Sequence, residues 1–255
     1  MSCSLPAEIV DLIIDYLCNE PAALKACCVV SKSWIHRTRK HLFARVEFHT
    51  RKSPIELWKK TFPDPCNSPA HHTRILSIYG ILAVTAADVG AGGWIRTFHN
   101  TVHLHLQYSC LNGFRSSLVP FHGLSPTLRS LRLSSTSSEV LDFICSFPFL
   151  EDLAWNPLSY GGGGRDTPST SPKLTGFLDL NVSNKIRLAV RGLLGLPGGL
   201  HFTKITMRGF IEDTESITDL VSRCSDTLKS LDLSCYIPGA FPPAYMSDRY
   251  LTVWM

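Results

Sequence analysis

The sequence has few charged residues and no long hydrophobic run. Charged side chains make up 18% of the 255 residues and hydrophobic ones 44%, a balance typical of a folded protein and not of a disordered tail. The longest weakly polar stretch, Gly80–Ile95, is too short to cross a bilayer and contains Asp88. The N-terminus has no early basic residue and its apolar run is interrupted at Glu8, Asp11 and Asp15, so no secretory signal is predicted.

Motifs for metal binding and catalysis are also lacking. The nine cysteines are an odd number, none is spaced as C-x-x-C, and Cys27 and Cys28 are adjacent, which suits neither a zinc site nor a simple disulfide. His103 and His105 would face the same way on a strand, but no acid or cysteine lies at ligand spacing. No nucleophile elbow or phosphate-binding loop is present. We expect no catalytic residue, metal or cofactor, in a reduced protein of the cytoplasm and/or nucleus.

Positive charge is concentrated near the N-terminus. The chain has a formal net charge of +4, and nine Lys or Arg residues against two Glu lie between positions 32 and 60. A nucleic-acid footprint is one interpretation of this segment. No interleaved aromatic residues or DNA-reading motif accompany it, which favours a solvated basic face.

Three short helices are predicted in the first 48 residues. Leu5-Pro6-Ala7-Glu8 is a helix start, because proline is tolerated in the first turn and Glu8 favours the positive end of the helix dipole. Apolar residues then recur at helical spacing, with Val10 and Ile14 widening the face that they form. The residues at this spacing are Ile9, Leu12, Ile13, Tyr16 and Leu17, and the widened face exceeds what one partner within the chain would need.

The second and third helices follow at once. Residues 22–30, after Pro21, are apolar nearly all round, so this helix is expected to be enclosed by its neighbours. Ser31 is a suitable N-cap for a third helix that carries Trp34 and Leu42. Three helices of this length enclose a very small core, so the unit is expected to need a partner.

This N-terminal pattern resembles the F-box. The resemblance covers Leu5 to about Phe48 and keeps the order and spacing of the family's motif. The residues that carry it are Leu5-Pro6-x-Glu8-Ile9-x-x-x-Ile13-x-x-x-Leu17, then Leu24-x-x-Cys27-x-Val29-Val30-Ser31-x-Ser33-Trp34, then Leu42-Phe43. The resemblance implies that the three helices bind a Skp-type adaptor protein, which links the chain to a cullin scaffold and a RING ubiquitin ligase.

The same resemblance suggests which residues contact the adaptor. They are Leu5, Pro6, Ile9, Ile13, Leu17, Leu24, Val30, Trp34 and Leu42. Leu17, Leu24 and Trp34 can equally be internal core residues, whereas Leu5 and Pro6 stand at the exposed start of the first helix.

Residues 49–72 are predicted to be a connector. Prolines at positions 54, 63, 65 and 69 flank a short helix over Ile55–Lys60, and this density of proline favours a semi-rigid linker over a strand. The predicted division of the chain is therefore an F-box over residues 1–48, a proline-rich connector over 49–72, and a recognition domain over 73–255.

The recognition domain contains an internal repeat. The motif L-x-L recurs every 22 to 28 residues, the period of a leucine-rich repeat. Its members are Leu76/Ile78, Leu104/Leu106, Leu131/Leu133, Leu153/Trp155, Leu178/Leu180, Ile205/Met207 and Leu231/Leu233. Helices are expected between them, over residues 138–147, 185–196 and 213–224 among others. The predicted fold is thus α/β, with a leucine-rich-repeat-like solenoid whose parallel strands line the concave face.

No polar capping repeat follows the last strand. The array is either complete or truncated here, and in both cases an unpaired edge is expected at Leu231–Ser234.

A protein substrate is expected on the concave face. If the L-x-L positions point into the core, the residues beside and between them point outward. This rule selects the candidate substrate-binding residues His103, His105, Arg132, Asp152, Asp179, Lys204, Arg208 and Asp232. The resulting prediction is a non-catalytic substrate adaptor of a ubiquitin ligase. The alternative is a repeat scaffold or nucleic-acid-associated protein with no ligase role.

Overall fold

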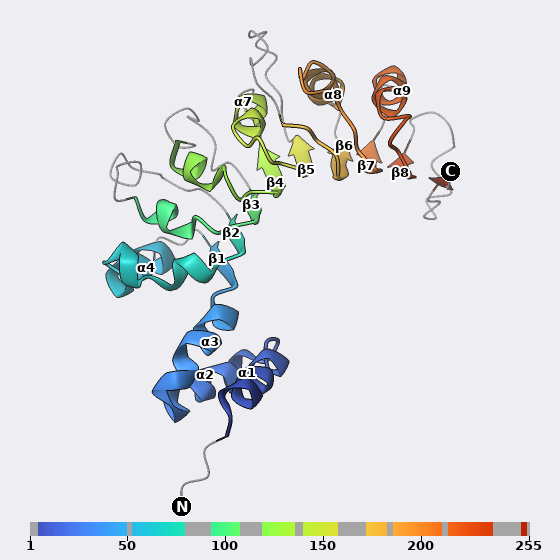
Figure 1. Ribbon diagram of the computed structural model, residues 1–255. Helices are drawn as coiled ribbons and strands as arrows, with labels where there is room; N and C mark the ends of the chain where they lie inside the picture. The colour runs from blue at the N-terminus through green and yellow to red at the C-terminus, as the bar shows by residue number, and fades with distance from the viewer. Residues whose placement is uncertain are drawn as a thin grey trace, which may run out of the picture.

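The chain forms an α/β structure, with three helices followed by one curved sheet (Figure 1). The computed structural model describes residues 5–49, 53–79, 93–107, 119–135, 140–157, 172–182, 186–210, 214–236 and 251–253. The sheet has nine strands in chain order; the first eight are parallel and the ninth is antiparallel. The predicted α/β class and the parallel sheet are confirmed.

Residues 7–42, the helical unit, contain α1 (Ala7–Tyr16), α2 (Pro21–Val30) and α3 (Lys32–Leu42). Helix α3 packs against both of the others. Ser31 caps α3 as predicted, since its side chain accepts a hydrogen bond from the backbone N–H of Ser33 at 3.3 Å.

The core of the helical unit is very small. Its hydrophobic cluster has three buried side chains with three more packed against them: Val10, Ile14 and Leu24, then Leu17, Trp34 and Leu42. Cys27 and Thr38 are also buried. The predicted enclosure of α2 is wrong, because Val29 is 85% and Val30 64% exposed. Helices of ten or eleven residues cover only a narrow stripe of one another, so most of the apolar surface of α2 stays outside.

The apolar residues of α1 divide between the core and the surface. Val10 and Ile14 point into the core, and of the predicted face only Leu17 packs there. The other four members are exposed: Ile9, Leu12, Ile13 and Tyr16. A helix that is apolar on two sides does not show by periodicity alone which side is internal.

All seven predicted L-x-L pairs lie on strands at matching register. The strands are β2 (Ile75–Tyr79), β3 (His103–Gln107), β4 (Ser130–Ser135), β5 (Asp152–Pro157), β6 (Phe177–Val182), β7 (Lys204–Phe210) and β8 (Ser230–Tyr236). Leu76 is aligned with Leu104, and the series continues to Leu231. The first member of every pair is buried, and among the second members only Leu233 is half-buried.

The sheet begins earlier than the sequence indicated. Strand β1 (Arg45–His49) pairs in parallel with β2 and buries Val46 and Phe48. These residues had been assigned to the F-box and connector. Their alternation of polar and apolar side chains is the pattern of a strand, but it lacks the L-x-L motif by which the other strands were found.

The predicted connector is part of the folded core. It contains α4 (Ser53–Thr61) and two short 3-10 helices, η1 (Pro65–Asn67) and η2 (Pro69–His72). Ala70 is fully buried, and Trp58 packs against Phe48 and Phe98. Proline here starts or ends short helices, and residues 53–72 complete the first repeat of the array.

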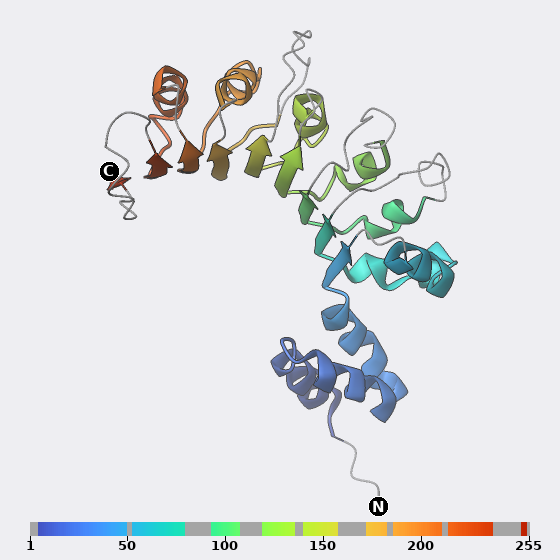
Figure 2. The same cartoon turned by 180° about the vertical axis from the view of Figure 1, so that it is seen from behind.

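Helices cover the convex side of the curved sheet, and the strands line its concave side (Figures 1 and 2). Beyond α4 the covering elements are η3 (Trp94–Phe98), η4 (Val119–Leu124), α7 (Val140–Cys145), α8 (Ile186–Leu194) and α9 (Thr214–Arg223). The last three fall within the predicted helical segments. The main core lies between these helices and the inward side chains of the strands.

The expected unpaired edge at Leu231–Ser234 was wrong. Strand β9 (Leu251–Val253) runs antiparallel to β8 and pairs with Leu231, Asp232 and Leu233. A chain that folds back in this way supplies backbone partners to the last parallel strand.

Candidate protein-interaction surfaces

Exposed apolar side chains gather on the helical unit. Nine large hydrophobic residues of the described chain are exposed, and seven of them lie between positions 5 and 30. Five form one outward face at helical spacing, which we call the α1 face: Leu5, Ile9, Leu12, Ile13 and Tyr16. A continuous apolar face of this kind on a small unit is typical of a protein-binding surface.

The structure separates the nine predicted adaptor contacts into three groups. Leu5, Pro6, Ile9 and Ile13 are exposed at or before α1, and Val30 is exposed at the end of α2. Leu17, Trp34 and Leu42 are half-buried against the small core. Leu24 is only 1% exposed, so it supports the core and presents no surface to a partner.

Two residues of the α1 face were missing from the predicted contacts. Leu12 is 64% and Tyr16 88% exposed. Both belong to the apolar face predicted for this helix, but only Ile9, Ile13 and Leu17 of that face were among the predicted contacts. The signal that could have found them is their spacing from Ile9 and Ile13, which places all four on one helical face.

An ion-pair cluster holds α1 against α3. The Asp15 carboxylate accepts hydrogen bonds from Arg37 Nε at 2.7 Å and from Arg37 Nη2, and it lies 2.6 Å from His41 Nε2. The hydrogen bonds from Arg37, and then that with His41, hold the pKa of Asp15 well below its usual range despite the opposing effect of burial. This cluster fixes the angle at which the α1 face is presented.

Asp15→Asn should destabilise the helical unit at neutral pH. Since the folded pKa lies below the unfolded value of about 3.9, the carboxylate stabilises the folded state at neutral pH. This contribution is lost as the pH falls below about 4 toward the folded pKa. Hydrogen exchange of the α1 and α3 amides should be faster in the variant at pH 7.

The difference from the wild type should shrink in acid, as followed by circular dichroism below about pH 4. Asp11→Asn, at an exposed acid of the same helix that acts on Arg37 through its charge alone, is the matched control and should change exchange much less. Equal exchange rates in Asp15→Asn and the wild type at pH 7 would contradict the role given to this cluster.

The eight candidate substrate-binding residues all lie on strands, on the side opposite the core. Four of them share one row across the sheet: His105, Arg132, Asp179 and Asp232. Arg132, Lys204 and Arg208 are exposed, and the other five are half-buried. The concave position follows from strand alternation, as predicted.

Several of these side chains already have partners within the chain. Asp152 Oδ1 accepts a hydrogen bond from the backbone N–H of Phe177 at 2.8 Å, which gives this residue a structural role. Arg208 lies 4.0 Å from Asp179, and the Lys204 ammonium lies 5.4 Å from the centre of the Phe177 ring. These contacts of Arg208 and Lys204 are long and both side chains are exposed, so the two cations remain available to a ligand. Asp152 is already engaged by its hydrogen bond from Phe177.

His105 of β3 lies near positively charged side chains. Burial, and then the positive charges of Arg132 and Arg45, lower the pKa of His105, so this imidazole is neutral near pH 7. Within the described segments no group of three or more His, Cys, Asp or Glu residues is arranged to hold a metal ion.

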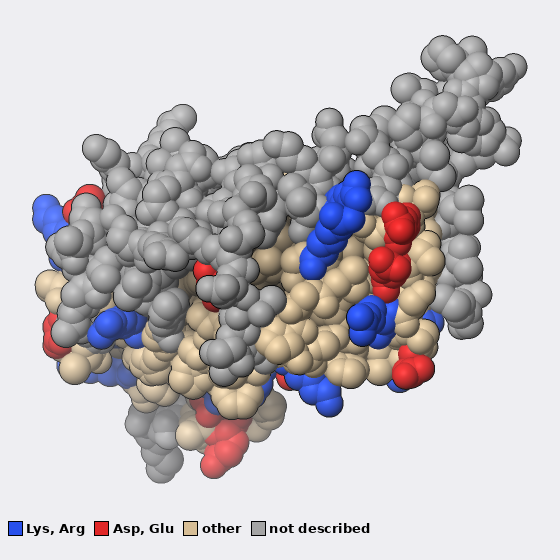
Figure 3. All heavy atoms as spheres, turned by 90° about the horizontal axis from the view of Figure 1, so that it is seen from above, with Lys and Arg blue, Asp and Glu red and all other residues tan. Residues whose placement is uncertain are grey.

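The basic N-terminal segment is partly neutralised and is spread over several elements. Arg37 pairs with Asp15, Arg45 lies 3.2 Å from Glu47, and Lys59 lies 3.3 Å from Glu56. On the convex surface, basic side chains near α8 stand beside acidic ones near α9 (Figure 3). Among the described residues, neither the basic N-terminal segment nor the convex surface forms an extended patch of positive charge, as nucleic-acid binding would require.

No protein-family model, curated protein or solved structure matches the chain. Among the described residues no helix has the length and apolar character needed to span a membrane. Most of the weakly polar stretch Gly80–Ile95 lies outside those residues.

Proposed function

We propose that the chain is the substrate-recognition subunit of a Skp–cullin–F-box ubiquitin ligase. In this proposal the helical unit is the F-box and binds a Skp-type adaptor, and through it the cullin and RING subunits. The sheet is a degenerate leucine-rich-repeat array that binds a protein substrate. The chain is non-catalytic, takes no metal or cofactor, and acts in the cytoplasm and/or nucleus.

The α1 face is the observation that carries the proposal. A helical unit with three buried apolar side chains leaves Leu12 and Tyr16 more than half exposed. Covering apolar surface of this kind with a partner protein contributes favourable free energy to the complex. The F-box resemblance of residues 5–48 names that partner as a Skp-type adaptor.

The direct test is co-purification of the full chain with a recombinant Skp-type adaptor. We expect a stable complex of one copy of each on size exclusion. Failure to form this complex, with the chain folded by circular dichroism, would overturn the ligase assignment. Binding of a single-stranded oligonucleotide in its place would favour the alternative of a nucleic-acid-associated scaffold.

Reversing charge on the concave face should remove the substrate and leave the adaptor bound. Arg132, Lys204 and Arg208 are the exposed cations among the candidate residues. Changing all three to Glu should deplete captured substrates about tenfold or more. Acidic groups of a substrate that pair with the three cations would then meet carboxylates and be repelled. Quantitative mass spectrometry of co-purified proteins measures this effect at constant adaptor recovery.

The matched control places the same charge change on the convex side. Lys60, Arg191 and Arg223 are exposed on α4, α8 and α9. Their triple change to Glu should leave the captured proteins unaltered. If both triple variants retain the same partners as the wild type, the substrate does not dock on the concave strands.

A further inference from the structure

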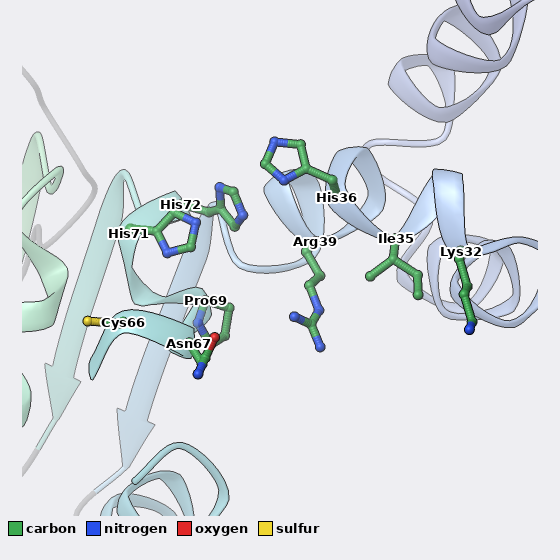
Figure 4. Close-up of a pocket in the computed structure, with 9 residues that line it drawn as sticks. All are labelled: Lys32, Ile35, His36, Arg39, Cys66, Asn67, Pro69, His71 and His72. Carbon is green, nitrogen blue, oxygen red and sulfur yellow. The ribbon is translucent and has the colours of Figure 1, made fainter. Parts of the chain in front are cut away.

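A second site lies where the helical unit meets the sheet. A cavity of about 440 Å³ separates α3 from the 3-10 helices η1 and η2 (Figure 4). One wall is a single face of α3, on which Lys32, His36 and Arg39 recur at helical spacing. The opposite wall carries Asn67, His71 and His72. The cavity lies away from both the α1 face and the concave strands.

Nitrogen-bearing side chains line this cavity on both walls. The His36 and His72 rings meet edge-on where the two walls join, with centres 5.3 Å apart, and the His71 and His72 ring centres are 3.9 Å apart. His71 donates through Nδ1 to the Ser68 carbonyl at 2.7 Å, which fixes the orientation of its ring.

The cavity has no acidic side chain in its lining. Within the described residues, neither Lys32 nor Arg39 has an acidic side chain within 4.0 Å. Burial, and then the positive charges of His71, His36 and Arg39, lower the pKa of His72 to about 4. His72 is therefore neutral near pH 7, and the unbalanced positive charge of the lining comes from Lys32 and Arg39.

We propose that this cavity binds a small phosphorylated compound, which bridges α3 and η2. A guanidinium binds phosphate oxygens in bidentate fashion, and imidazole and ammonium groups add further donors. The volume is within the range of small-molecule sites and exceeds the needs of a single phosphate ion. A metal ion does not fit, because the described residues hold no suitable ligand group. The proposal is independent of the ligase assignment.

Inorganic pyrophosphate is the probe for the test. The full chain should bind it more tightly than inorganic phosphate by isothermal titration calorimetry at constant ionic strength. Arg39→Gln should weaken binding about tenfold or more, since it removes the bidentate donor. Lys60→Gln removes the same charge from an exposed position of α4 outside the cavity and should change the affinity less than about twofold.

Hydrogen exchange tests the bridge itself. Pyrophosphate should slow exchange in the C-terminal turn of α3 and in η2 of the wild type, but not of Arg39→Gln. The absence of binding at about 10 mM pyrophosphate would overturn the proposal, as would equal losses in Arg39→Gln and Lys60→Gln. Preferential binding of a short single-stranded oligonucleotide would reassign the basic groups to nucleic acid.

Discussion

Replacing Ile9 and Ile13 with aspartate should abolish capture of the Skp-type adaptor. Both side chains are exposed on the α1 face, at 43% and 40%, and neither belongs to the core of the helical unit. In the complex the substitutions would bury two unpaired carboxylates in an apolar contact. We expect affinity to fall at least about a hundredfold, or about 2.7 kcal/mol, in surface plasmon resonance with purified adaptor.

The control for this experiment is Leu57→Asp. Leu57 is 64% exposed on α4, outside the helical unit, so its replacement adds one carboxylate at an exposed apolar position away from the α1 face. It should leave adaptor binding unchanged. An undiminished affinity of the double variant, with helicity retained by circular dichroism, would show that the α1 face is not the adaptor surface.

Phe98→Ala should strongly destabilise the sheet. Phe98 is fully buried in an aromatic cluster with Phe48 of β1, Trp58 of α4 and Trp94 of η3, at ring-centre distances of 5.4 to 6.1 Å. Truncation of a buried aromatic residue removes its transfer free energy and leaves a cavity. We expect the free energy of unfolding to fall by about 3–5 kcal/mol in urea denaturation.

Phe149→Ala is the matched control for the aromatic cluster. Phe149 is 51% exposed, with the Arg129 guanidinium 4.9 Å above its ring, so its loss should cost only about 1 kcal/mol. The comparison also tests whether residues 53–72 belong to the core, because Trp58 packs against Phe98. Equal effects of the two variants would mean that the aromatic cluster around Phe98 does not stabilise the sheet.

The repeat array was the part of the fold most accessible from sequence. A buried parallel strand needs apolar side chains at alternate positions, and Leu131 and Leu133 satisfy this need in the same way as Leu178 and Leu180. Each repeat stacks on the next with little change, so one strand predicts its neighbours. The same alternation placed all eight candidate substrate-binding residues on the concave side.

The first repeat escaped prediction because its signals differ. Val46 and Phe48 alternate correctly, but the strand lacks the L-x-L motif and follows α3 without a turn signal. The prolines of residues 53–72 indicated a linker, yet they lie in or beside helices that cover the sheet. Burial of Ala70 and the packing of Trp58 are tertiary effects that composition does not contain.

The N-terminal site was predictable in outline but not in orientation. The apolar excess of α1 indicated a partner, whereas the side that faces the core depends on how α1 lies on α3. The cluster of Asp15, Arg37 and His41 decides this. It joins residues more than twenty positions apart, and no local pattern announces it.

The short connection between α3 and β1 fixes the orientation of the helical unit relative to the sheet. Only Phe43 and Ala44 separate the two elements. The Ala44 carbonyl accepts the N–H groups of Arg74 at 2.8 Å and Ile75 at 3.0 Å, and the Phe43 carbonyl accepts the Thr73 hydroxyl at 2.9 Å. In the proposed complex, a protein bound to the helical unit and a protein bound to the sheet would therefore be held in one relative orientation. A single residue added to the last turn of α3 would rotate the helical unit by about 100° relative to the sheet. The two-residue connection between α3 and β1 therefore determines the distance and orientation between the two bound proteins.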